Sequence, residues 1–270
     1  MADGPDLTAQ GGGWGREFLV FGLKNAWACI FAGTFLALII ATRLWYPADA
    51  WLHRYDALLL GAVAIQLILI ALRLENRAEC LAIIVFHLLA TGMEIFKVAV
   101  GSWTYPEPGG LRLLGVPLMA GFMYSAVGSY IARIWRIFRF GFTALPGRGT
   151  MLAIAVAIYI NFFTHHVMID LRWAILAWLA WCLRRTWVHF TIHRARRRMP
   201  LLLGLALVAL FIWFAENIAT ACRVWAYPGQ FAGWTPVSPH KITAWFLLMF
   251  VSFAIIALLH PRSGEPDRSA

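Results

Sequence analysis

Charged side chains are scarce in this sequence. Only 13% of its 270 residues are Asp, Glu, Lys or Arg, whereas 61% are hydrophobic. An ordinary soluble domain carries about 25% charged residues, so the composition excludes that class. Apolar stretches of transmembrane length recur from Trp27 to Leu259 and leave no room for a separate soluble domain. We therefore expect a multi-pass membrane protein.

Cysteine and processing signals are also sparse. The four cysteines lie within or at the ends of apolar runs, and none forms a C-x-x-C pair. They are typical of small packing residues, so neither a disulfide nor a cysteine metal site is expected. The first sixteen or so residues are polar and Gly-rich and lack a basic segment leading into a short apolar core. This pattern predicts no cleavable signal peptide.

The apolar pattern predicts an all-α bundle of about eight transmembrane helices. We expect one transmembrane domain over residues 24–260, with halves at 24–140 and 149–260, between polar tails at 1–23 and 261–270. The expected spans are 24–45, 56–74, 80–101, 113–135, 150–168, 172–190, 200–223 and 242–260.

Lys and Arg are distributed unevenly between the two sides of these spans. One side carries Arg16, Lys24, Arg73, Arg77, Arg133, Arg136, Arg139, Arg148, Arg184, Arg185, Arg194, Arg196, Arg197, Arg198, Arg262 and Arg268. The other carries Arg43, Arg54, Arg112, Arg172, Arg223 and Lys241. The positive-inside bias places the richer side and both termini in the cytoplasm. Topology then explains the net charge of +10 without a nucleic-acid partner.

One motif occurs twice, as Glu-x8-Trp-x-Tyr-Pro starting at Glu94 and again at Glu216. Its aromatic residues are Trp103 and Tyr105 in the first copy and Trp225 and Tyr227 in the second. The offset places the third span over the seventh and the fourth over the eighth, which predicts two parallel four-span repeats. Chance is the alternative, because Trp and Tyr favour membrane interfaces and Pro follows helix ends.

Each repeated glutamate lies inside an apolar span. Glu94 and Lys97 are one helical turn apart, with His87 near the same face, so we expect Lys97 to pair with Glu94 and hold it ionised. Glu216 has Ala219 where the first copy has lysine. Intramembrane charges are functional by default. The alternative is an ion pair that only locks two helices together.

Four polar residues close the fifth span. Asn161 and His165 are four apart, as are His166 and Asp170. An Asp one turn from a His fixes its tautomer and raises its basicity, so the pair suggests a proton shuttle or a metal ligand. Interfacial histidines bound to water are the alternative.

A second pair of histidines, His189 and His193, has the helical i, i+4 spacing that suits a shared metal. The further His boxes of membrane di-iron enzymes are missing, so no metal site is expected and no cofactor is identified. The basic run 194–198 is typical of orientation and contact with anionic lipid.

Four segments, 94–107, 115–124, 161–166 and 216–220, resemble the YoaT-like family of bacterial membrane proteins. The resemblance implies a bacterial inner-membrane location but no reaction, because that family is a domain of unknown function. An intramembrane Glu followed by Gly-x-Trp-x-Tyr is also similar to membrane carotenoid hydratases and lycopene cyclases. Those proteins protonate isoprenoid double bonds with carboxylates.

The interpretation we favour is an enzyme that binds a lipophilic, isoprenoid-like molecule from the outer half of the membrane. Glu94 and Glu216 would supply acid and base, and His165, His166 and Asp170 would relay protons outward. The expected substrate-binding residues are Trp103, Tyr105, Asn161, Asn217, Trp225 and Tyr227. A proton-coupled transporter and a non-catalytic assembly or scaffold protein are the alternatives. Membrane lipids are the expected partners, and the oligomeric state stays open.

Overall fold

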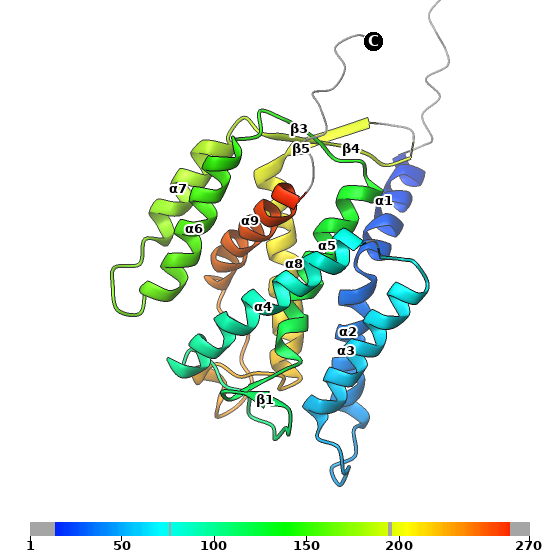
Figure 1. Cartoon of the computed structure of the whole chain (residues 1–270), viewed down its shortest axis with the longest axis vertical. Coiled ribbons are helices and arrows are strands. Elements are labelled where there is room, and N and C mark those ends of the chain that lie inside the picture. Colours follow the sequence, from blue (N-terminus) through cyan, green and yellow to red (C-terminus); the bar gives the residue numbers. More distant parts are fainter. Residues whose placement is uncertain (1–13, 76, 194–195, 260–270) are drawn as a thin grey trace, which may run out of the picture.

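The computed structural model describes residues 14–75, 77–193 and 196–259, and the chain is mostly helical (Figure 1). The helices are α1 (Trp14–Ala28), α2 (Ile30–Trp45), α3 (Arg54–Ala71), α4 (Arg77–Ala99), α5 (Ala120–Ile137), α6 (Arg148–Thr164), α7 (Arg172–Leu183), α8 (Leu201–Ala221) and α9 (Lys241–Leu259), with a 3-10 turn η1 (Pro228–Gln230). The strands are β1 (Arg112–Leu113), β2 (Val116–Pro117), β3 (Gly141–Thr143), β4 (Trp187–Thr191) and β5 (Arg196–Pro200).

Each expected span overlaps one of the helices α2 to α9. By length and composition, α3, α8 and α9 are apolar enough to cross a membrane, and α1 with α2 makes a fourth candidate that is bent by 68°. Large apolar side chains are exposed along these helices, such as Leu67 at 60% and Phe211 at 70%. Exposed apolar surface on this scale is typical of contact with lipid or another apolar partner. These features are consistent with a membrane protein.

The second part of the expected N-terminal tail is helical, because α1 begins at Trp14. Residues 17–23 read Glu-Phe-Leu-Val-Phe-Gly-Leu, which is apolar enough to form a helix whose outer face exposes Phe18 at 77%. The Lys24 ammonium donates to the Ile137 carbonyl at 3.5 Å and to the Thr191 carbonyl at 3.3 Å. These bonds tie α1 to the end of α5 and to β4. The remainder of that tail, residues 1–13, and the expected C-terminal tail, 261–270, lie outside the described residues.

The all-α expectation is also corrected, because two small antiparallel sheets are present. β1 and β2 form a hairpin where the span 113–135 was expected to begin, and its turn carries positive φ at Leu114 (49°) and Gly115 (86°). β3, β4 and β5 form a three-stranded sheet. β4 overlaps the end of the expected span 172–190, whose helix α7 ends at Leu183. Side chains along β4 alternate between partly exposed and buried, which is the period of a strand.

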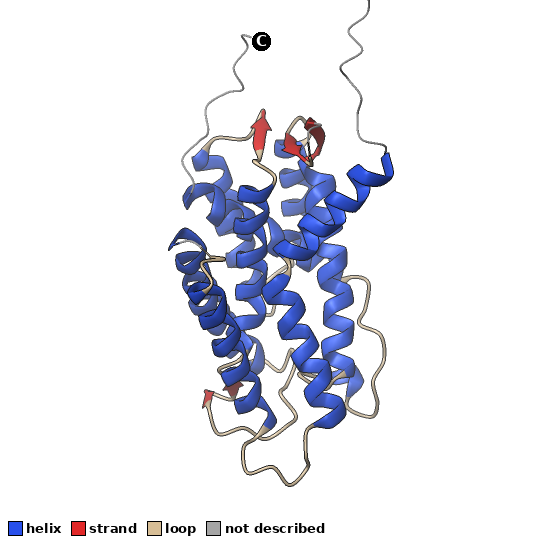
Figure 2. Ribbon diagram, turned by 90° about the vertical axis from the view of Figure 1, so that its right-hand side faces the viewer, coloured by secondary structure: helices blue, strands red, loops and turns tan. Residues whose placement is uncertain are grey.

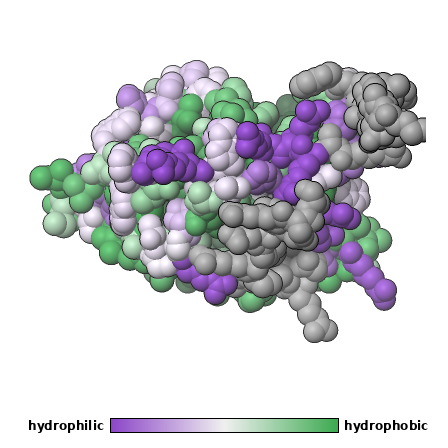
Figure 3. Space-filling model, turned by 90° about the horizontal axis from the view of Figure 1, so that it is seen from above, coloured by the Kyte–Doolittle hydropathy of each residue, from purple (hydrophilic) through white to green (hydrophobic). Residues whose placement is uncertain are grey.

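The two sheets mark opposite ends of the bundle (Figures 1 and 2). We call them the sheet end, with β3 to β5, and the loop end, with the β1–β2 hairpin. Hydrophilic side chains gather at the sheet end beside apolar ones (Figure 3). The largest buried cluster is formed mainly by the five helices from α5 through α9 and includes Ile154, Leu179 and Phe250. A second cluster at the loop end surrounds Tyr55 and Trp103.

Candidate functional site

The two copies of the repeated motif meet at the loop end. Thr104 and Ala226, the middle residues of the two Trp-x-Tyr segments, form an antiparallel bridge with hydrogen bonds of 3.0 and 2.9 Å. The Trp103 ring lies edge-on to the Tyr227 ring, with 6.0 Å between centroids. Equivalent positions of the two segments are thus paired, as a local two-fold relation requires.

The helices that precede these segments, α4 and α8, end in the same way. The N–H of Ser102 donates to the carbonyl of Lys97 at 2.9 Å, and that of Val224 donates to Ala219 at 3.0 Å. The residue before each donor has positive φ, at Gly101 (72°) and Arg223 (56°). This is the hydrogen bonding of a Schellman helix end, which reverses the chain. The reversal returns the following Trp and Tyr to the level of the glutamate, which explains the fixed spacing of the motif.

Glu94 is held by three neutral donors. Its side chain is 2% exposed. Trp103 Nε1 donates to Oε2 at 2.8 Å, the Tyr105 hydroxyl donates to the same oxygen at 2.7 Å, and the Tyr124 hydroxyl donates to Oε1 at 2.7 Å. Trp103 and Tyr105 belong to the motif, and Tyr124 comes from α5. Buried carboxylates need such donors, because an unpaired polar atom in an apolar interior is costly.

The expected ion pair between Glu94 and Lys97 is wrong. Lys97 Nζ lies 2.7 Å from His166 Nε2 and 3.4 Å from His165 Nε2. It also lies 4.2 Å from the centroid of the Phe162 ring. A spacing of three residues places two side chains on one face of a helix but does not fix where each side chain points. Lys97 points to the end of α6, whereas Glu94 points to α5 and the loop.

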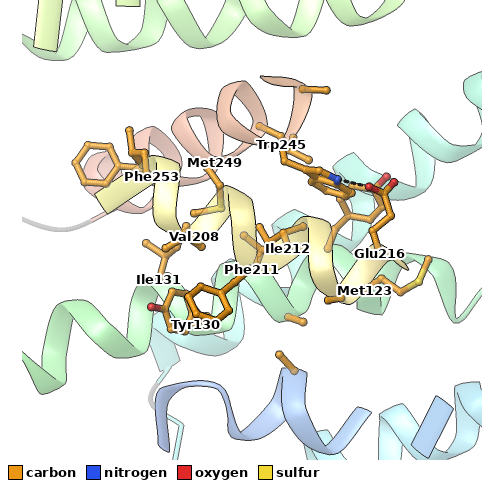
Figure 4. Close-up of a pocket in the computed structure, with 18 of the residues that line it drawn as sticks. Met123, Tyr130, Ile131, Val208, Phe211, Ile212, Glu216, Trp245, Met249 and Phe253 are labelled. Atoms are coloured by element: carbon orange, nitrogen blue, oxygen red, sulfur yellow. Dashed lines mark hydrogen bonds between the residues drawn. The ribbon is translucent and has the colours of Figure 1, made fainter. Parts of the chain in front are cut away.

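Glu216 has two neutral donors. It is 3% exposed. The Tyr227 hydroxyl donates to Oε1, and Trp245 Nε1 from α9 donates to Oε2 at 2.7 Å (Figure 4). Among the described side chains Trp225, the counterpart of Trp103, makes no hydrogen bond with Glu216. Lys241, the first residue of α9, places its ammonium 4.3 Å from the centroid of the Tyr227 ring.

The expected pairing of His166 with Asp170 is also wrong, because α6 ends at Thr164 and both residues lie beyond it. Asp170 accepts hydrogen bonds from Asn161 Nδ2 at 3.0 Å and from the N–H of Arg172 at 2.9 Å, and it pairs with the Arg172 guanidinium at 3.4 Å. Burial acts to raise the pKa of Asp170, but these donors outweigh it and the pKa is lowered.

The pKa of His166 is lowered as well. Partial burial is the largest cause, and the positive charges of Lys97 and His165 act in the same direction. The two imidazole rings are in contact, with 4.1 Å between centroids. A neutral His166 leaves Nε2 free to accept the proton of the Lys97 ammonium. The two histidines of the expected relay therefore contact Lys97, whereas Asp170 forms its hydrogen bonds with Asn161 and Arg172.

The two asparagines that were expected to bind substrate form hydrogen bonds with the backbone of neighbouring loops. Asn161 Oδ1 accepts from the N–H of Leu171 at 2.9 Å. Asn217 Oδ1 accepts from the N–H of Val237 at 2.8 Å, and its Nδ2 donates to the Trp213 carbonyl at 2.8 Å. Both amides thus satisfy backbone groups of the connections that follow α6 and α8.

His189 and His193 do not share a helical face. His189 lies in β4, where its Nε2 is 2.6 Å from Thr143 Oγ1, and His193 follows the strand. The helical i, i+4 geometry on which a shared metal would depend is absent. Over the described ranges, 14–75, 77–193 and 196–259, no group of three or more His, Cys, Asp or Glu side chains is close enough to hold a metal ion.

Both glutamates border one cavity of about 1080 Å³. Its polar wall, at the loop end, includes Glu94, Lys97, His165, Arg172, Glu216 and Lys241. Trp103, Asn161, Trp225 and Tyr227 also line it. Most of the other wall residues are apolar, and in the close-up they form a row from Glu216 and Trp245 at one end to Phe253 at the other (Figure 4). The cavity continues to Phe138 and Phe190 beside the sheet.

Three residues of this site were not among the predicted site residues: Trp245 as a donor, Lys241 as a cation, and Tyr124, whose hydroxyl the sequence allowed to point inward but for which ordinary packing was preferred. The repeat offers one signal that could have found a donor. Trp245 lies one position before the residue that the motif offset pairs with Tyr124. An aromatic residue at matched positions of the fourth and eighth spans is thus visible in the sequence once the repeat is accepted.

The fold and site define a mostly helical protein with membrane-compatible helices and a buried pair of carboxylates. The chain belongs to the family described as Protein of unknown function (DUF817), whose model matches residues 17–253. It is 40% identical over 260 residues to Uncharacterized protein YoaT of Bacillus subtilis (strain 168), covering 94% of this chain and 98% of that protein. The resemblance to the YoaT-like family is therefore confirmed. A solved structure, a cross-linked MvINS trimer, matches with a TM-score of 0.49 and 14% identity, over 71% of this chain and 98% of the other.

Proposed function

We propose that this protein is a multi-pass enzyme of the bacterial inner membrane that performs acid/base chemistry on a lipophilic molecule. The observation that carries the proposal is the single cavity bordered by Glu94 and Glu216 and otherwise mainly apolar. Small-molecule sites in proteins are typically largely apolar clefts with a few converging polar groups. Carboxylates held inside such a cavity are suited to exchange protons with a bound molecule.

The proposed topology has eight spans in two tandem parallel halves, with α2 to α5 in the first and α6 to α9 in the second. Three observations support the repeat: the matched helix ends of α4 and α8, the bridge between Thr104 and Ala226, and donors from both α5 and α9 on the glutamates. An even number of spans per half keeps the two halves parallel. The positive-inside bias then places the sheet end in the cytoplasm and the loop end outside.

Glu216 is the group that we assign to proton transfer. A carboxylate has about four lone-pair sites, and neutral donors occupy three at Glu94 but two at Glu216. Glu216 therefore retains more capacity to bind a substrate proton. Glu94 holds Trp103 and Tyr124 at the cavity wall, and we assign it a positioning role. The cluster of Lys97, His165 and His166 extends from the cavity wall, at Lys97 and His165, to the exposed side chain of His166.

The test is to purify the wild-type protein and the Glu216→Gln variant in mild detergent, extract both with organic solvent and identify bound molecules by mass spectrometry. The amide preserves size but removes the exchangeable acid. Loss of a general acid or base slows a reaction by roughly 10²- to 10⁴-fold. We expect the variant to retain a lipophilic molecule that differs from the one in the wild type, because the unreacted form accumulates.

Asp49→Asn is the matched control, because it converts an exposed carboxylate at the loop end, outside the cavity wall, to an amide. It should co-purify with the same molecule as the wild type. The same molecule in the wild type and in Glu216→Gln would contradict the acid/base role. Bulk phospholipid alone in every sample would contradict binding in the cavity.

A proton-coupled transporter is the second candidate, and one observation favours it: the cavity reaches from the loop end to Phe138 and Phe190 beside the sheet. A carrier needs access to its carboxylates from both sides. Proton flux into liposomes that depends on Glu216, with no chemical change in the bound molecule, would favour transport over catalysis. Neither binding nor flux would favour the scaffold alternative.

A further inference from the structure

Three cationic side chains converge on the loop end of the cavity. Lys97 is in the last turn of α4, Arg172 begins α7 and Lys241 begins α9, and all three line the cavity. They are close enough for Lys97 to feel the charges of both other groups and for Lys241 to feel that of Arg172. Like charges repel one another, most strongly where water is excluded. Their convergence requires a compensating interaction.

Carboxylates of the chain do not supply that compensation fully. Among the described residues, neither Lys97 nor Lys241 has a carboxylate oxygen within 4.0 Å. Lys97 is 4% exposed, and its ammonium lies against the imidazole nitrogens of His165 and His166 and the rings of Phe96 and Phe162, with Asp170 as an opposite charge farther away. Lys241 lies over the rings of Tyr227 and Trp103, at 4.3 and 5.6 Å from their centroids. Arg172 has Asp170, at 3.4 Å.

Both glutamates accept hydrogen bonds from neutral donors, and Glu216 acts on Lys241 only from beyond ion-pair distance. A buried ammonium without an anionic partner is unfavourable. An anion placed among the three cations would satisfy them together. Phosphate and carboxylate groups are the anions that Lys and Arg bind in proteins.

The rest of the cavity wall indicates which chemical group is attached to the anion. Its wall runs from the cations along α5, α8 and α9 towards Phe253, through side chains such as Met123, Ile131 and Val208 (Figure 4). Apolar and aromatic side chains of this kind bury hydrocarbon. The polar groups lie at one end and the apolar wall extends away from them, which matches an amphiphile with one charged head and one long chain.

We propose that the ligand of this cavity is a lipid with an anionic phosphate or carboxylate head, bound by Lys97, Arg172 and Lys241, and a long apolar chain that extends towards the sheet end. This inference rests on the proposed function, since it names the substrate class of the same cavity. The head lies beside Glu216, so the reacting bond is within the first few atoms of the molecule.

The test measures binding of four probes with matched chains to the purified protein by native mass spectrometry and tryptophan fluorescence. The probes are hexadecyl phosphate, hexadecanoate, hexadecanol and hexadecyltrimethylammonium. We expect an anionic probe to bind at least tenfold more tightly than hexadecanol, and the cationic probe to bind most weakly. The order of phosphate and carboxylate identifies the head group.

Variants assign the binding to the cations. Lys97→Gln and Lys241→Gln should each weaken binding of the tighter anionic probe by roughly tenfold, which is the expected effect of losing one charge-assisted hydrogen bond. The affinity for hexadecanol should stay within about twofold of the wild-type value. Lys241→Arg should retain tight binding of the anion. Lys24→Gln, which removes a lysine at the sheet end, is the matched control and should bind every probe as the wild type does.

Two failures are distinguishable. Equal binding of hexadecanol and the anionic probes, or unchanged anion binding in both lysine variants, would overturn the anionic head while the lipophilic cavity stands. If no probe binds, although the unfolding temperature shows that the purified protein is folded, the proposed function and this inference are both overturned.

Discussion

Glu94 and Glu216 occupy the same point of two matching helix ends, yet their surroundings differ. Glu94 has three neutral donors and no cation within ion-pair distance among the described residues. Glu216 has two donors, and its charge is felt by Lys241 at the start of α9. The position of Lys97 in the first half is Ala219 in the second. The shared part is backbone geometry, and the difference lies in the side chains that reach each carboxylate.

This difference in surroundings favours a structural role for Glu94 and a chemical role for Glu216. A carboxylate saturated by donors fixes the positions of those donors and contributes to stability. A carboxylate with spare capacity in a cavity can exchange a proton with a bound molecule. Under the proposed function, the half with Glu94 builds the rim of the cavity, whereas the half with Glu216 supplies the reactive group. Variants that affect the two glutamates unequally test this division.

Alanine substitutions should give the largest effect and an unequal one. Glu94→Ala leaves Trp103 Nε1 and the hydroxyls of Tyr105 and Tyr124 unpaired, and each buried unsatisfied group costs about 1–3 kcal/mol. We expect a loss of roughly 3–9 kcal/mol in the free energy of unfolding. Glu216→Ala leaves two donors unpaired, so its loss in the free energy of unfolding should be about two thirds as large. Thermal unfolding in one detergent, monitored by circular dichroism, measures the difference.

Glu94→Gln provides the control for this comparison, because its carbonyl oxygen still accepts while its amide cannot. Its stability should lie between those of the wild type and Glu94→Ala. A greater loss in Glu216→Ala than in Glu94→Ala would contradict the assignment of the structural role to Glu94.

The two helix ends allow a test of intermediate size. Gly101 and Arg223 share positive φ, which a side chain disfavours by roughly 1–2 kcal/mol. No atom lies within 4 Å of a Cβ added at Gly101, so Gly101→Ala introduces backbone strain without a clash. We expect it to lower stability by about 1 kcal/mol. Arg223→Gly should raise stability by less than that, because glycine also gains freedom in the unfolded chain.

Chemical or thermal unfolding of the two single variants and the double variant checks this prediction. The effects should be additive within about 0.5 kcal/mol if each helix end acts independently. A loss of stability in Arg223→Gly would mean that the arginine side chain contributes more than the backbone strain removes. The helix ends would then differ in kind, not only in strain.

Much of the fold was accessible from the sequence because it depends on local patterns. The apolar runs located α2 to α9, and the repeated motif singled out Trp103, Tyr105 and Tyr227, which the structure shows to be hydrogen-bonded to the glutamates. The errors at α1 and β4 have a local cause. A short apolar run has the same composition in a tail helix, a span or a strand, and only the alternation along β4 distinguishes it.

The remaining parts of the site depend on packing between distant segments. Tyr124 is 30 residues from Glu94, and Trp245 is 29 residues from Glu216. Their approach requires the docking of α5 and α9, for which a single sequence gives no direct signal. The partner of Lys97 was mistaken because spacing along α4 specifies a helical face, whereas the end of α6 provides the nearest acceptors.

The smallest expected effect concerns the cluster of Lys97, His165 and His166, whose lysine is replaced by Ala219 at the matching position of the second half. The pKa of His166 in the folded protein lies below its ordinary value of 6.5, because of partial burial and the charges of Lys97 and His165. The folded state therefore binds fewer protons than the unfolded state below that pH. The contribution of His166 to the free energy of unfolding is therefore fully present above about pH 6.5 and decreases as the pH falls below this value. Asp170 adds a separate loss only below its ordinary pKa of 3.8.

Unfolding temperatures measured between pH 8 and pH 5 in one buffer series check this dependence. His166→Gln should flatten the decrease on the acidic side. Lys97→Gln should flatten it partly, because it removes one of the causes while leaving the imidazole, and the double variant should resemble His166→Gln. The same slope in the wild type and in His166→Gln would mean that protonation of His166 does not oppose the fold. In that case Lys97 keeps its place through the Phe162 ring, and the asymmetry between the two halves rests on the glutamates alone.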